Sequence, residues 1–183
     1  MRKALGLFFA ASLVTSVGAW AAGPAGAVAK GPTCKAFSAT ETTSPGLPIV
    51  TSAKKVNATV TVSGKLTGCT GGGVKSASIS QTYKYNGNCA TLITGKGGKT
   101  TPAKPTTTFT WSNHKKSTAT TTTTTLTKPG VTPAKIKLVT KIGNGQFAGT
   151  TSTGTITLTS PSGACTKSPG TKATLTGGST TFK

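Results

Sequence analysis

The stretch Val56-Asn57-Ala58-Thr59-Val60-Thr61-Val62-Ser63-Gly64-Lys65-Leu66 alternates apolar and polar side chains along most of its length. Its valines and Ala58 recur at every second position, so they share one face of an extended chain. This period is typical of a β-strand with one face buried and the other in water. The glycine-rich segment that follows, residues 68–73, has the composition of a turn. The stretch therefore predicts a half-buried strand.

Further strands of the same character follow at short intervals along the chain. They are expected near residues 33–42 and over residues 74–85, 106–112, 117–126, 136–142, 147–159 and 172–182. Asn113-His114-Lys115-Lys116 is interpreted as a turn, and Asn144-Gly145 as a tight hairpin between the strands on either side. About eight short strands with regular turn signals predict one all-β domain, either an antiparallel β-sandwich or a barrel.

Three segments have a different composition. Residues 95–105 and 128–133 are rich in glycine, proline and lysine, so we expect exposed loops there. Residues 120–125 are all threonine. Because threonine is β-branched, this run favours a strand over disorder, and we expect it to be wet on both faces.

The first 29 residues have the pattern of a cleaved export signal. Met1-Arg2-Lys3 is cationic, and residues 4–17 are almost wholly apolar but shorter than the ~20 residues of a membrane-spanning helix. Cleavage is expected after Ala29, within Ala27-Val28-Ala29, with Ala21 as the earlier alternative. Residues 30–183 would then form the mature domain, without a transmembrane segment. We expect a secreted protein, extracellular or associated with the cell wall.

The four cysteines, Cys34, Cys69, Cys89 and Cys165, all lie in the expected mature domain. An even number in an exported protein of this size predicts two disulfides. Strand direction favours Cys34–Cys69 and Cys89–Cys165, because alternating strands would bring each pair to the same end of the sheet. The other two connectivities stay open. A metal site is disfavoured, because the chain has no Cys-x-x-Cys pair and only one histidine.

Acidic residues are almost absent, which argues against an enzyme. Glu41 is the single Asp or Glu of the chain and His114 its single histidine. A glycosidase usually needs two carboxylates, and a hydrolytic triad needs a nucleophile, a base and an orienting acid. His114 lies in a predicted turn, where a solvated side chain is the simpler interpretation. We therefore expect no catalytic site, no metal and no cofactor.

Lysine supplies nearly all of the charge. The formal net charge is +20, and it becomes +18 once Arg2 and Lys3 leave with the signal. Such a field attracts polyanions, and lysine without arginine favours point-charge attraction over bidentate recognition. We expect binding to anionic cell-envelope polymers or, nonspecifically, to other polyanions. The candidate contacts are Lys54, Lys55, Lys115, Lys116, Lys135, Lys137 and Lys141, of which the last three share one strand face.

Two alternatives to charge-driven binding stay open. The lysines could serve only solubility and the protection of edge strands, which would leave a structural or interaction module of the envelope. A hydrolase is the remaining alternative. Tyr83 and Tyr85 face the same way and could stack bases or sugars, but core packing explains them as well. Trp111, beside Phe109, is expected in the core or at its rim.

Several short motifs resemble those of uncharacterised secreted β-rich proteins of actinobacteria. The resemblance implies export, an all-β fold and oxidised cysteines, and it implies no activity or site. The motifs that carry it are Ser44-Pro45-Gly46-Leu47, Ser63-Gly64-Lys65-Leu66-Thr67-Gly68-Cys69-Thr70-Gly71, Asn88-Cys89-Ala90, Thr110-Trp111-Ser112-Asn113 and Gly145-Gln146-Phe147-Ala148-Gly149.

Overall fold

The structure, a computed structural model, describes residues 30–94, 97–125, 133–160, 165 and 167–183. The predicted export signal and its two cleavage sites lie outside these residues, as does nearly all of the loop expected at 128–133. Within the described part, the chain forms β-strands and one short helix. Their bounds are β1 Thr33–Cys34, β2 Ala36–Leu47, β3 Val56–Thr67, β4 Ala77–Gly87, α1 Cys89–Thr94, β5 Lys99–Thr101, β6 Thr106–Trp111, β7 Lys116–Thr125, β8 Ala134–Gly145, β9 Thr151–Thr159, β10 Gly170–Gly177 and β11 Thr180–Thr181.

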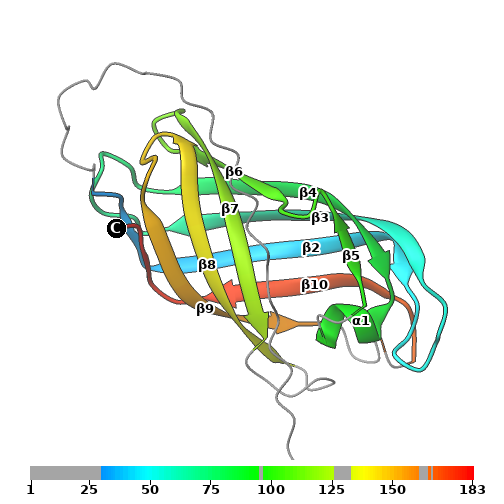
Figure 1. The fold of residues 1–183 in the computed structure, drawn as a ribbon. Helices are drawn as coiled ribbons and strands as arrows, with labels where there is room; N and C mark the ends of the chain where they lie inside the picture. Colours follow the sequence, from blue (N-terminus) through cyan, green and yellow to red (C-terminus); the bar gives the residue numbers. More distant parts are fainter. Residues whose placement is uncertain (1–29, 95–96, 126–132, 161–164, 166) are drawn as a thin grey trace, which may run out of the picture.

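Eight of these strands form a closed antiparallel barrel, which confirms the predicted all-β fold and selects the barrel over the sandwich (Figure 1). The order is β3-β2-β10-β9-β8-β7-β6-β4, and β4 pairs again with β3 to close the ring. The β3–β4 pairing is long, running from Val56 opposite Gly87 to Leu66 opposite Ala77. The other edge of β4 is shared, since β6 pairs with its first half and β5 with its second.

Aromatic side chains fill one end of the barrel. Phe109, Trp111, Phe147 and Phe182 are all buried there, and we call these four residues the aromatic plug. Phe109 stacks on Trp111 with ring centroids 5.6 Å apart, and Phe147 meets Trp111 edge-on at 4.9 Å. The Trp111 indole nitrogen donates a hydrogen bond of 2.8 Å to Ser117, so its polar atom is satisfied in the core. The core location predicted for Trp111 is confirmed.

The turn after β8 differs from the predicted hairpin, and the plug explains the difference. Asn144 and Gly145 do not form a two-residue turn, since both belong to β8 and pair with β7. The chain reverses over residues 146–150 instead, and β9 begins at Thr151. This longer turn places Phe147 in the plug with a left-handed φ of 64°. Burial of a phenylalanine ring, at about 1.5–3 kcal/mol, outweighs the local preference of Asn-Gly for a tight turn.

One other local prediction needs correction. The segment 95–105, expected to be a loop, contains strand β5, which pairs with the end of β4. The threonine run is a strand, β7, as expected. Thr121 lines the cavity and its hydroxyl lies 3.1 Å from that of Thr140, while Thr123 lines the cavity and is exposed.

The two disulfides pair as strand direction predicted and lie at opposite ends of the barrel. Cys34–Cys69 joins residues 35 positions apart beside the aromatic plug. Cys89–Cys165 joins residues 76 positions apart at the other end, next to Leu47. In a chain-entropy account each bridge stabilises the fold by about 4 kcal/mol. In the described part of the chain, no helix has the length and apolar character needed to cross a membrane.

Truncating the centre of the plug should destabilise the barrel. We expect Trp111→Ala to lower the free energy of unfolding by about 3–5 kcal/mol, because it removes a buried ring and leaves a cavity. Thr110→Ala, on the outer face of the same strand, should change it by less than about 1 kcal/mol. Urea denaturation followed by far-UV circular dichroism measures both. Equal losses in the two variants would contradict the assignment of the plug as the main core.

Candidate functional site

A cavity of about 480 Å³ occupies the part of the barrel that the aromatic plug does not fill. Side chains at alternate strand positions point into it. Four of these inward side chains remain partly exposed to solvent, namely Ile136, Leu138, Leu158 and Tyr83. The interior is therefore hollow and reached by solvent at this end. We call the end bordered by Thr100, Ala103 and Pro105 the mouth.

One side of the cavity is apolar and comes from β8, β9 and β10. These strands alternate as the sequence predicts, with lysines or threonines outside and branched apolar side chains inside. The resulting wall can pack against a hydrocarbon surface. Its main residues are Ile136, Leu138, Ile156, Leu158 and Leu175.

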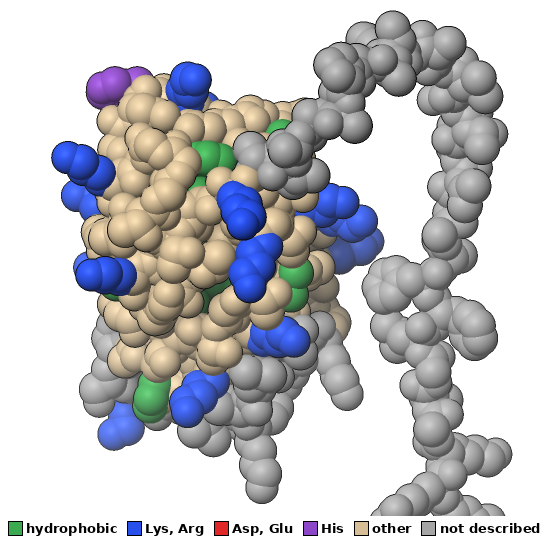
Figure 2. Space-filling view, turned by 90° about the vertical axis from the view of Figure 1, so that its left-hand side faces the viewer, with side chains coloured by type: hydrophobic (Ala, Val, Ile, Leu, Met, Phe, Trp, Pro, Cys, Tyr) green, Lys and Arg blue, Asp and Glu red, His purple; other side chains and the backbone are tan. Residues whose placement is uncertain are grey.

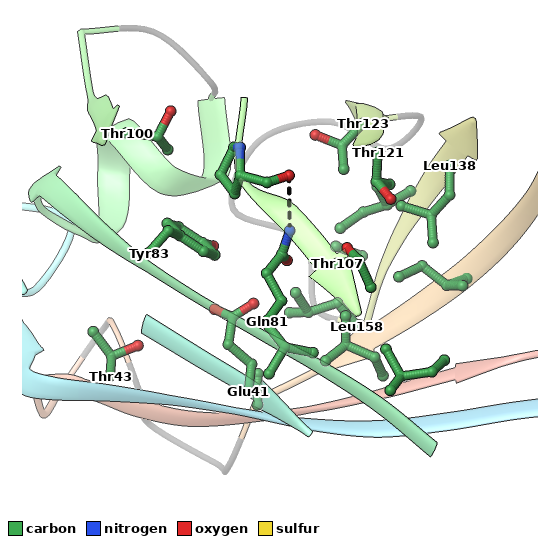
Figure 3. Close-up of a pocket in the computed structure, with 18 of the residues that line it drawn as sticks. Glu41, Thr43, Gln81, Tyr83, Thr100, Thr107, Thr121, Thr123, Leu138 and Leu158 are labelled. Atoms are coloured by element: carbon green, nitrogen blue, oxygen red, sulfur yellow. Dashed lines mark hydrogen bonds between the residues drawn. The ribbon is translucent and has the colours of Figure 1, made fainter. Parts of the chain in front are cut away.

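The facing side, from β2, β3 and β4, carries polar groups among the apolar side chains of Phe37, Val62 and Ile79. Cross-strand register places Glu41 opposite Val62, and Val62 opposite Gln81, so that these three residues form one row. In the next row towards the mouth, Thr43 and Tyr83 flank Val60 in the same way. Figure 3 shows Glu41, Gln81 and Tyr83 pointing into the same part of the cavity. The cavity thus has a polar cluster, and we define it as Glu41, Thr43, Gln81 and Tyr83.

Glu41 is a buried carboxyl without a partner in the described structure. Its side chain is 9% exposed, and no described residue gives it an ion pair or a hydrogen bond. Burial raises the pKa of the Glu41 carboxyl above its ordinary value of 4.5, because the charged form loses its hydration. An unpaired buried acid is costly to a fold, so its presence in a solvent-reached cavity points to a ligand contact.

The two tyrosines of β4 have different surroundings. Burial raises the pKa of Tyr83, and the nearby Glu41 carboxylate raises it further, so the Tyr83 hydroxyl stays protonated as a donor and acceptor. Tyr85 is buried outside the cavity lining, and its hydroxyl donates to the Thr91 hydroxyl at 2.8 Å. The stacking platform considered for this pair is therefore wrong, because both rings face the interior.

Gln81 connects the polar cluster to the mouth. Its side-chain amide nitrogen donates a hydrogen bond of 3.3 Å to the backbone carbonyl of Pro105 (Figure 3). This bond fixes the amide so that its carbonyl oxygen remains available as an acceptor in the cavity. Pro105 is thereby held over the same strand that carries Tyr83.

The seven lysines proposed as polyanion contacts do not come together. Lys54 and Lys55 lie between β2 and β3 on the side of the mouth, where Lys55 donates to the Gly97 carbonyl at 2.8 Å. Lys115 and Lys116 lie at the turn into β7, at the end with the plug. Lys135, Lys137 and Lys141 do share the outer face of β8, opposite Ile136, Leu138 and Ile142, as the alternation predicts.

Lysines also lie elsewhere on the outer surface. Figure 2 shows them spread over one face, with no acidic side chain among them. The only acidic side chain of the whole chain, Glu41, is inside the barrel. Lys172 is the single lysine among the described residues that border the cavity, and its own side chain is exposed.

The other candidate catalytic and metal-binding side chains form no second site in the described part of the chain. His114 is exposed in the turn between β6 and β7, with a left-handed φ of 65°. Among the described residues, no three His, Cys, Asp or Glu side chains gather as metal ligands would. The scarcity of acids in the sequence does not reveal the cavity. The alternation of Phe37, Ala39 and Glu41 does place Glu41 on the inner face of β2.

Replacing Glu41 should change how stability depends on pH. Because the folded-state pKa is raised, the native state holds this proton more tightly than the unfolded state does. The free energy of unfolding of the wild type should therefore fall as pH rises from about 4.5 through the folded-state pKa. Glu41→Gln should lack this fall and be the more stable protein at neutral pH. Urea denaturation at a series of pH values measures the difference, and parallel profiles would contradict a buried, unpaired Glu41.

No family model matches this chain, and no curated protein or solved structure matches it either. The resemblance to secreted actinobacterial proteins therefore stays a prediction from the sequence. The only basis for a function is the barrel itself, with an apolar wall, a polar cluster and an unpaired carboxyl around one cavity.

Proposed function

We propose that this protein is an exported binding protein that holds one small, mainly apolar molecule inside its barrel. The observation that carries the proposal is the cavity of about 480 Å³ with Glu41 unpaired in its wall. Ligand sites usually have volumes of about 300–1,000 Å³, with apolar walls and a few polar groups that orient the ligand. An eight-stranded barrel is wide enough to hold one small ligand.

The energetics of the interior support binding over a purely structural role. Natural cores are packed to high density, and buried polar groups nearly always have partners. Here the plug is filled by aromatic rings and its indole nitrogen is bonded to Ser117, whereas the other half stays hollow. A structural barrel gains nothing from a hollow half or from an unpaired carboxyl. A ligand that fills the space would bury the apolar wall and pair the polar cluster.

Export is the second element of the proposal and rests on two features. The first 29 residues have the pattern of a cleaved signal, and the four cysteines pair in two disulfides, which persist in oxidising compartments. We place the protein outside the cytoplasm, where a carrier or scavenger of apolar molecules would meet its ligand in water.

Binding of an uncharged fluorescent probe tests this function. N-phenyl-1-naphthylamine emits strongly only in apolar surroundings, and we expect saturable binding with one site per barrel. Leu158→Trp, which fills the apolar wall, should weaken binding at least tenfold. Thr155→Trp adds the same ring to the exposed outer face of β9 and should leave binding within about twofold. Circular dichroism checks that both variants fold. Absent or unsaturable binding to the wild type, or equal effects of the two substitutions, would overturn the proposal.

A second candidate function is the binding of anionic envelope polymers, and one observation favours it. Lys135, Lys137 and Lys141 form a row of exposed positive charge along β8. A polymer with regularly spaced phosphates could follow such a row, and its affinity would fall steeply with salt. The wide distribution of the other lysines supports a solubility role for most of the charge.

A matched pair of triple variants tests the lysine row. Replacing Lys135, Lys137 and Lys141 by alanine should lower the salt concentration at which the protein leaves purified cell wall. Replacing Lys65, Lys84 and Lys167, which are exposed but dispersed, removes the same charge. We expect the first set to weaken binding about tenfold more than the second. Equal losses would show that only net charge matters, and no retention at low salt would remove this candidate.

A further inference from the structure

The cavity contains a single ionisable acid and, among the described residues, no basic side chain that faces it directly. Glu41 lies on β2 between two neighbours that cannot pair with it, Ala173 on β10 and Val62 on β3. Across the polar cluster, Tyr83 is the other titratable group, and Lys172 borders the cavity with an exposed side chain. Within residues 30–94, 97–125, 133–160, 165 and 167–183, no group pairs with this carboxyl, so a bound ligand can supply its partner.

We infer that the ligand carries a basic nitrogen, which binds as an ammonium group against the Glu41 carboxylate while its apolar body lies on the β8–β10 wall. This inference rests on the function proposed above and names the ligand class. It follows from the position of Glu41, 9% exposed and aimed into a cavity that is otherwise apolar or neutral.

The acceptors around Glu41 match the donors of an ammonium group. A primary ammonium offers three N–H donors, and it needs three acceptors once it leaves water. The polar cluster supplies the Glu41 carboxylate, the carbonyl oxygen of Gln81 and the hydroxyl oxygens of Thr43 and Tyr83. The bond from Gln81 to Pro105 uses the amide nitrogen and so leaves that carbonyl oxygen to the ligand. Such charge-assisted bonds are about twice as strong as neutral ones.

The other ligand classes fit the cavity less well. A carboxylate ligand would bring a second negative charge next to Glu41 in surroundings of low polarity, so one of the two acids would have to stay protonated. A neutral acceptor, such as a ketone, would satisfy the protonated carboxyl but leave the other acceptors unpaired. A purely apolar ligand would leave the Glu41 carboxyl buried without a partner, at a cost of about 1–3 kcal/mol.

While the Glu41 carboxyl is protonated, binding has to move one proton, and where that proton goes depends on whether the ligand arrives as a neutral amine or as an ammonium ion. In the empty barrel, burial favours the protonated carboxyl. A neutral amine accepts that proton, so that the O–H bond breaks as the new N–H bond forms. An ammonium ion instead requires the carboxyl to release its proton to water. Affinity for the ammonium form should therefore rise with pH up to the pKa of Glu41 in the empty barrel and then level off.

Three ligands with the same apolar cage test the inference, namely adamantyl amine, adamantyl alcohol and adamantyl carboxylate. Their affinities follow from displacement of N-phenyl-1-naphthylamine or from direct calorimetry. We expect the amine to bind roughly 10–100-fold more tightly than the alcohol at neutral pH, and the carboxylate to bind most weakly. The ratio of amine to alcohol affinity should fall as pH is lowered.

Two variants separate the charge of Glu41 from its shape. Glu41→Gln keeps the size of the side chain, and the ratio of amine to alcohol affinity should fall to about one. Thr42→Gln adds the same amide to the exposed outer face of β2 and should keep the wild-type ratio. A wild-type barrel that binds the dye but does not prefer the amine overturns this inference and leaves the proposed function standing. A barrel that binds neither the dye nor the amine overturns both.

Discussion

The hydrogen-bond ladder between β3 and β4 is the constraint on which the rest of the structure depends. The other barrel strands form an antiparallel series from β3 round to β4, and this one pairing turns the series into a ring. Closure sets the width of the interior, because eight strands enclose a space that large side chains fill only if enough of them point inward. At one end four aromatic rings do so. At the other end the inward side chains leave a cavity of about 480 Å³.

Charge is divided between the two faces of the same sheet. Strand alternation puts lysines outside and apolar side chains inside, while the one carboxylate of the chain follows the inner pattern of β2. The positive outer surface of such a protein repels cations at long range, and salt screens this repulsion over about 8 Å at physiological ionic strength. Any selection for a cation must therefore come from direct contact with Glu41, after entry through the mouth.

The sequence predicts the local features of this fold well and the long-range features poorly. The alternation in residues 56–66 predicts β3, and the even number of cysteines with alternating strand direction predicts both disulfides. Whether the strands make a sandwich or a barrel depends on the pairing of β2 with β10, two strands far apart in the sequence, which no local pattern encodes. Asn144-Gly145 shows the same limit, because its turn preference yields to the burial of Phe147 against Trp111, a residue distant in the sequence. For the cavity, alternation could have placed Glu41 inside, but the hollow around it depends on the sizes of side chains from eight strands.

The pairing of β1 with β11 brings the two ends of the described chain to the same end of the barrel. Thr33 lies opposite Thr181, and the Phe182 backbone nitrogen donates to the Pro32 carbonyl at 3.0 Å, so both ends of residues 30–183 emerge beside the plug. Strand β5, which carries Thr100 of the mouth, lies at the opposite end of the barrel (Figure 1). A tether attached at Lys30 or Lys183 would hold the barrel by its filled end and present the cavity to solution. The fold is thus already oriented for immobilisation on a sensor surface without any change to the strands.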